Sequence, residues 1–120
     1  MSRALFLDDL REPPSGDWIV VRSSAEAIAW CEAHGAPDHI SFDHDLGGDD
    51  TGMRLAHWLV NRDLDANEVH QTWLPAHFTY TIHSANPVGW INLDSLLQSY
   101  LRSRQPEPPK ARRPTTPFQA

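Results

Sequence analysis

The stretch that decides the fold is Ile40-Ser41-Phe42-Asp43-His44-Asp45-Leu46-Gly47-Gly48. An apolar run ends abruptly in Asp-His-Asp, and a glycine-rich loop follows. A short apolar run bounded by turn residues is typical of a buried strand. Ionisable side chains at the mouth of such a strand are costly unless they have partners, because charges that leave water must be compensated. We therefore predict a strand over residues 39–42 that ends at a binding site.

Two other strand-like runs end in the same way. Residues 3–7 are followed by Asp8-Asp9, and residues 78–82 are followed by His83-Ser84. A fourth, β-branched run covers residues 18–21. The first run is apolar from Ala4 onward, as in a parallel strand covered on both faces. In the run over residues 78–82, apolar residues alternate with threonines, which indicates a less buried face or a sheet edge.

Helices are predicted between and after these strands. Ser24 is the expected N-cap of a helix over residues 25–34, and Gly35 stops it. Thr51 precedes an amphipathic pattern over residues 52–61. Asn86-Pro87 is a strong helix start, and the helix that follows is expected to end near Arg104.

Residues 63–77 are polar, so we predict irregular structure there. Trp73, in this segment, is a candidate contact for a substrate or partner. The other tryptophans are explained by packing.

Strands that alternate with helices imply a parallel sheet with right-handed crossovers. In open sheets of this kind, ligands bind beyond the carboxyl ends of the strands. Six polar residues fall at such ends after three of the predicted strands, namely Asp8, Asp9, Asp43, Asp45, His83 and Ser84. We therefore expect them to converge on one site for a metal ion and a phosphate.

The length and composition of the chain limit the number of domains and the kinds of partner that it can have. The 120 residues fit one domain over 1–104, followed by a proline-rich tail over 105–120 that we expect to be flexible. A net charge of -6 argues against duplex nucleic acid as a partner, and one cysteine excludes an internal disulfide. No run is long enough to span a membrane and no signal peptide is visible, so we expect a cytoplasmic protein.

The pattern of acidic and hydroxyl residues at three strand ends resembles that of the receiver domains of response regulators. These residues are Asp8-Asp9, Asp43 and Ser84. In receivers, the acids hold Mg²⁺ and the hydroxyl contacts phosphate. Receivers also need a lysine after a fifth strand, but the only lysine here is Lys110 and the last helix leaves no room for that strand. The pattern therefore argues against phosphorelay signalling through Asp43.

A more specific resemblance covers about residues 3–103. Three motifs in order are similar to the cyclic-phosphate-processing receiver-like family, the cREC domains: Leu7-Asp8-Asp9-Leu10-Arg11, Ser41-Phe42-Asp43-His44-Asp45-Leu46-Gly47 and His83-Ser84-Ala85-Asn86-Pro87. The resemblance implies an α/β, receiver-like (flavodoxin-like) three-layer sandwich with a reduced parallel sheet of about four strands in the order 2-1-3-4. It also implies phosphoesterase action on cyclic-phosphate ends or nucleotides.

The chemistry of the residues suggests a role for each. Carboxylates are the ligands that hard divalent cations prefer, so the metal candidates, for Mg²⁺ or Mn²⁺, are Asp8, Asp9, Asp43 and Asp45. The catalytic candidates are His83 and His44 with Asp43, because histidine titrates near neutrality. Either histidine could instead be a metal ligand. The phosphate-binding candidates are Ser84, Asn86 and Arg11, although Asn86 can equally be a plain helix cap.

The leading hypothesis is a metal-dependent phosphoesterase that acts on a cyclic nucleotide or a 2′,3′-cyclic phosphate end. The alternative is a non-catalytic receiver-like module that binds or sequesters a nucleotide or a protein partner. Phe42-Asp43-His44-Asp45 also resembles the nucleophile motif of haloacid-dehalogenase-like phosphatases, but that motif normally follows the first strand of a longer domain. The edge left by the fourth strand is compatible with a homo-oligomer.

Overall fold

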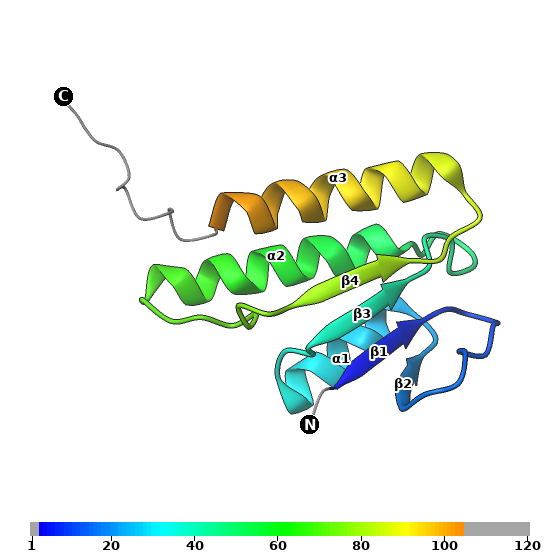
Figure 1. The fold of residues 1–120 in the computed structure, drawn as a ribbon, viewed down its shortest axis with the longest axis horizontal. Coiled ribbons are helices and arrows are strands. Elements are labelled where there is room, and N and C mark those ends of the chain that lie inside the picture. The colour runs from blue at the N-terminus through cyan, green and yellow to red at the C-terminus, as the bar shows by residue number, and fades with distance from the viewer. Residues whose placement is uncertain (1–2, 105–120) are drawn as a thin grey trace.

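The computed structural model describes residues 3–104. The strands are β1 (Ala4–Leu7), β2 (Trp18–Val21), β3 (His39–Phe42) and β4 (Thr79–Ile82). The helices are α1 (Ser24–His34), α2 (Gly52–Glu68) and α3 (Pro87–Arg104), as Figure 1 shows. The predicted tail lies outside the described residues. Within them, no helix combines the length and apolar character that a membrane crossing requires.

The strands form one parallel sheet in the order β2-β1-β3-β4. This confirms the predicted α/β class, the four-stranded receiver-like sheet and the strand order. β1 is central and apolar because it pairs on both sides, and β4 lies at an edge. The alternation of threonines in β4 was therefore a correct signal of its position.

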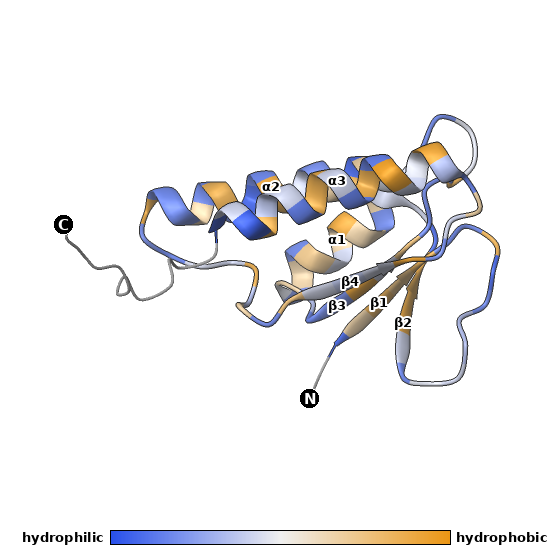
Figure 2. Ribbon diagram, turned by 45° about the horizontal axis from the view of Figure 1, so that its top comes forward, coloured by the Kyte–Doolittle hydropathy of each residue, from blue (hydrophilic) through white to orange (hydrophobic). Residues whose placement is uncertain are grey.

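The layers differ from the three-layer sandwich that was expected. All three helices lie on the same side of the sheet, as Figure 2 shows. α1 and α2 are both crossovers that run in the same direction across the sheet, so right-handedness places them on one face. β1 and β2 are joined by a loop over residues 8–17 that contains no helix. The described residues therefore make two layers, and the opposite face of the sheet carries no helix.

The side chains of the sheet follow this asymmetry. Those that face the helices form the core, and Leu5, Leu7, Ile40 and Phe42 are fully buried there. The helix-free face carries an aromatic row instead. The ring of Phe6 lies edge-on to Trp18 at 5.7 Å, and Trp18 lies edge-on to His39 at 5.9 Å. These rings shield one another where no helix covers them.

α2 extends seven residues beyond the predicted end, through Glu68. The prediction of irregular structure was wrong for this part because Asp63, a polar residue, occupies a core-facing position. Its carboxylate is fully buried and accepts the backbone N–H groups of Trp73 and Leu74, at 3.1 and 2.8 Å. Arg104 Nη1 pairs with it at 3.0 Å. A buried carboxylate with this many donors is satisfied, but its sequence signature is that of a loop.

The structure also bears on two local predictions, the N-cap of α1 and the role of Trp73. The N-cap of α1 is Ser23 rather than Ser24, because the hydroxyl of Ser23 accepts the N–H of Glu26 at 3.0 Å. Trp73 packs edge-on against Trp58, with ring centroids 5.5 Å apart, which explains it as a packing residue.

Candidate functional site

The site is built where three strands end. The backbone N–H groups of Asp8, Asp43 and His83 each donate to the last carbonyl of the neighbouring strand, at 3.2, 2.9 and 2.9 Å. The ladder therefore continues one residue past each strand, and with it the alternation of side chains between the two faces. Asp8 follows Phe6 by two residues, so it lies on the helix-free side.

Three side chains that are far apart in the sequence meet there. One ligand atom each from Asp8, Asp43 and His83 lie within 4.8 Å of one another. We call this set the Asp8–Asp43–His83 group. It joins residues from β1, β3 and β4, and the parallel arrangement of these strands is what brings them to one edge.

Asp8 is the fixed member of the group, with only 1% of its surface exposed. Its Oδ1 accepts the N–H groups of Leu10 and Arg11 at 2.9 and 2.8 Å, and its Oδ2 lies 3.0 Å from His83 Nε2. Burial alone would raise the pKa of Asp8, but these hydrogen bonds outweigh burial and lower it. Asp8 is therefore an ionised carboxylate held by its own loop.

Asp43 has the opposite tendency. Burial and then the charge of Asp8 raise the pKa of Asp43, and Asp9 adds to the effect, although Oδ1 accepts the N–H of His44 at 2.8 Å. Two nearby carboxylates whose pKa values are pushed apart are a common feature of functional sites. In this arrangement the ionised form of Asp8 is favoured, whereas ionisation of Asp43 is disfavoured.

His83 is held on three sides. Its ring stacks on Phe6 at 4.5 Å, with an angle of 2° between the planes. Nδ1 lies 2.7 Å from the hydroxyl of Ser41, while Nε2 faces Asp8. When Nε2–H donates to the carboxylate, Nδ1 accepts from the hydroxyl; when Nε2 is needed as an acceptor or ligand, the hydroxyl can accept from Nδ1–H instead.

Ser41 and Phe6 are residues that the sequence analysis did not assign to the site. Both carry a signal that could have revealed them. Ser41 precedes Asp43 by two residues and Phe6 precedes Asp8 by two, and side chains two apart on a strand share a face. A serine between buried apolar residues of a strand is also a polar group that requires a partner.

Other predicted residues lie outside this group. His44 Nδ1 pairs with Asp45 Oδ1 at 2.8 Å, and the Nδ2 amide of Asn86 donates to Asp45 Oδ2 at 3.2 Å. The His44 ring packs so closely on Gly89 of α3 that a Cβ there would overlap it. This second cluster ties the loop after β3 to the start of α3. Asp9 lies beside the glycine-rich loop, with Oδ2 facing Gly47.

The phosphate candidates are placed differently from one another. Asn86 caps α3 by accepting the N–H of Gly89 at 3.0 Å, and the hydroxyl of Ser84 accepts the N–H of Asn86 at the same distance. Both side chains are therefore engaged in starting the helix, as was predicted for Asn86. Arg11 is exposed, and its guanidinium donates to the carbonyl of His83 at 3.3 Å. Arg22 also contacts the group's backbone, since its Nη1 donates to the carbonyl of Asp8 at 3.1 Å, but its Nη2 is paired with Glu12 at 2.7 Å.

Comparison with known proteins gives one match. No curated protein and no solved structure matches the chain. Residues 3–99 match a family model described as "Cyclic-phosphate processing Receiver domain". The matched range covers more than half of the chain and contains every strand and the three residues of the Asp8–Asp43–His83 group.

Proposed function

The chain belongs to the family of cyclic-phosphate processing receiver domains, and we propose that it is a metal-dependent phosphoesterase that opens a cyclic phosphate. The observation that carries the proposal is the convergence of Asp8, Asp43 and His83, with ligand atoms within 4.8 Å of one another. The substrate class is a cyclic nucleotide or a 2′,3′-cyclic phosphate end. The description of the family supports this class of ligand, and the geometry of the group supports the proposed chemistry.

The residues of the group suit a divalent cation. The raised pKa of Asp43 results from burial and from a second carboxylate nearby, and a cation between them would remove that conflict. Carboxylate oxygens suit Mg²⁺ and Mn²⁺, and an imidazole nitrogen suits transition-metal ions, so the mixed set favours Mn²⁺ over Mg²⁺. When bound, such a cation supplies positive charge against the phosphoryl oxygens and makes nearby water more acidic.

The chain's own residues account for binding and proton transfer. Asp8 is held rigidly by two backbone N–H groups, so it fixes the position of a ligand without rearrangement. Ring opening requires one proton taken from water and one given to the leaving oxygen. Nε2 of His83 serves one role at a time: it either binds the cation or moves the proton, and Ser41 supports both, because its hydroxyl can accept from Nδ1–H or donate to Nδ1. Arg11 is the side chain that we assign to the phosphate charge.

The test is turnover of a panel of cyclic mono- and dinucleotides and of RNA with a 2′,3′-cyclic phosphate end, with Mg²⁺, with Mn²⁺ and with a chelator. We expect a linear phosphate product that depends on the metal and is lost in Asp43→Asn and His83→Ala. Asp45→Asn is the matched control, since Asp45 belongs to the second cluster, and it should retain turnover.

The non-catalytic alternative gives a different result in the same experiment. A protein that only sequesters a cyclic nucleotide would bind it and release it unchanged on denaturation. Recovery of intact ligand under every metal condition would therefore overturn the proposed hydrolysis.

A further inference from the structure

β4 has an unpaired outer edge. No strand among residues 3–104 lies beyond it in the sheet. The N–H groups of Thr79 and His83 point towards β3, where they donate to carbonyls at 3.1 and 2.9 Å. Backbone groups alternate in direction along a strand, so the N–H and C=O groups of Tyr80 and Ile82 face away from β3. This edge therefore offers donors and acceptors to another strand.

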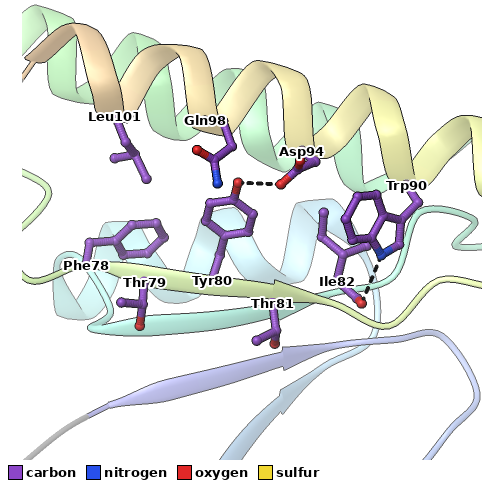
Figure 3. A pocket seen from close by; sticks show the side chains of 9 residues that line it. All are labelled: Phe78, Thr79, Tyr80, Thr81, Ile82, Trp90, Asp94, Gln98 and Leu101. Carbon is purple, nitrogen blue, oxygen red and sulfur yellow. Dashed lines mark hydrogen bonds between the residues drawn. The ribbon is translucent and has the colours of Figure 1, made fainter.

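A groove runs beside this edge, between β4 and α3. It has a volume of about 510 Å³, and its walls are formed by β4 and by α3 side chains that include Trp90, Asp94 and Leu101. Figure 3 shows the indole N–H of Trp90 donating to the carbonyl of Ile82, at 3.3 Å, and the hydroxyl of Tyr80 donating to Asp94, at 2.8 Å. Trp90 nevertheless remains 40% exposed.

The edge lacks most of the features that usually prevent pairing. Natural edge strands are protected by short length, lysine, proline, bulges or inward-pointing charges; β4 is short, but Thr79-Tyr80-Thr81-Ile82 contains no charged residue and no proline. The chain as a whole carries a charge of -6. Two copies of an acidic protein repel one another over most of their surface, so an uncharged strand is the part at which they can meet.

We propose that β4 pairs with β4 of a second copy, antiparallel, about a twofold axis that passes through Thr81. Tyr80 then lies opposite Ile82 of the second copy, and the outward N–H and C=O groups of these two residues bond to one another in both directions. The carbonyl of Ile82 already accepts the indole N–H of Trp90, and its second lone pair accepts the N–H of the second copy. Aromatic against β-branched residues and threonine against threonine are favourable cross-strand pairs. The sequence of the strand is therefore complementary to itself in this register.

The groove adds the surface that a short strand lacks. A stable interface buries at least about 1,000 Å² in total, and four residues of strand cannot supply that area. In the proposed arrangement both α3 helices flank the same axis, so the apolar walls that include Trp90 and Leu101 come together. Val88 and Ile91, 67% and 59% exposed, continue the apolar surface at the start of α3. This inference stands apart from the proposed catalysis.

Disulfide trapping of the full chain tests the register. Residues opposite one another in a non-hydrogen-bonded antiparallel pair have Cα atoms about 4.5 Å apart, within disulfide range. Thr81→Cys should therefore form a covalent dimer on mild oxidation. Thr79→Cys is the matched control: it is exposed on the same face, but its two copies would be about 13 Å apart along the strands. Cys31 adds no background, because burial raises the pKa of its thiol to about 12.

Sedimentation of the unmodified chain over a wide concentration range gives the independent measurement. We expect the mass to rise from 13.6 kDa towards twice that value. Thr81→Lys should keep the mass at that of the monomer, because two like charges would meet on the axis. Ser99→Lys on α3 is the control and should still dimerise. Equal cross-linking of both cysteine variants, or a dimer that survives Thr81→Lys, would overturn the proposal. So would a monomer whose Tyr80 and Ile82 amides resist hydrogen exchange, since another segment would then cover the edge.

Discussion

Asp43→Asn is expected to stabilise the metal-free protein while removing its response to divalent cations. Asp43 and Asp8 offer oxygen atoms no more than 4.8 Å apart. Two unit charges at that distance repel by about 3 kcal/mol at an effective dielectric constant of 20. Asp43 is half-buried, so water screens part of this repulsion, and we expect a gain of about 1 kcal/mol in the free energy of unfolding at neutral pH. Asparagine keeps the oxygen that accepts the N–H of His44.

The gain should depend on pH with a defined sign. Because the pKa of Asp43 is raised in the folded state, its contribution to stability is fully present below the ordinary value of 3.8 and is lost as the pH rises through the raised value. Replacement by asparagine removes that loss. The variant and the wild type should therefore differ little in acid and should differ by the full amount at neutral pH.

Urea denaturation followed by tryptophan fluorescence measures both effects, with and without Mn²⁺. A ligand that binds only the folded state stabilises it in proportion to the logarithm of its concentration. The wild type should gain stability from Mn²⁺, and the variant should gain little. Asp45→Asn is the control: its carboxylate is paired with His44 and Asn86, which lower its pKa, so no gain is expected. A variant less stable than the wild type at neutral pH, or equally stabilised by Mn²⁺, would refute the reasoning.

Three further substitutions probe the site and the core. Ser41→Ala should lower the free energy of unfolding by about 1 kcal/mol, because His83 loses the hydroxyl that contacts its Nδ1. For the same reason, Mn²⁺ binding measured by calorimetry should weaken about 10-fold or more. Ser41→Thr keeps a hydroxyl and should restore part of the affinity. Gly52→Ala should destabilise by about 2 kcal/mol or more in denaturation, because a Cβ there would overlap the backbone carbonyl of Asp43, which cannot move aside. Asp63→Asn should cost about 3 kcal/mol at neutral pH, since it breaks a buried ion pair. Hydrogen bonds lower the pKa of Asp63 despite its burial, so this stability is present above 3.8 and should disappear as the pH falls through the lowered value.

The sequence was sufficient for the sheet because its signals are local and consistent. Each strand is a short apolar or β-branched run that ends in a turn, and crossover rules then fix a parallel sheet. The prediction that six residues converge followed from the same rules, since residues at the carboxyl ends of neighbouring strands must share an edge, and three of the six, Asp8, Asp43 and His83, meet in one group. These predictions required only the order of the strands and helices along the sequence.

What the sequence could not give depends on side-chain direction and on remote partners. His44 and Asp45 follow Asp43 directly after the end of β3, yet they turn towards α3, where Gly89 leaves room for the imidazole ring. The length of α2 was misjudged because Asp63 is neutralised by Arg104, a residue 41 positions later. The number of layers was misjudged because no pattern within the strands shows which face lacks a helix.

The buried carboxylate in α2 and the three-strand site lie at opposite ends of the sheet. Arg104 reaches from that carboxylate to the carbonyls of Leu74 and Pro75, just before β4 begins, whereas the Asp8–Asp43–His83 group forms where the strands finish. The buried ion pair that stabilises the fold and the proposed binding site are thus separated along the length of the strands. Substitutions at the ion pair are therefore expected to change the melting temperature without changing the geometry of the Asp8–Asp43–His83 group.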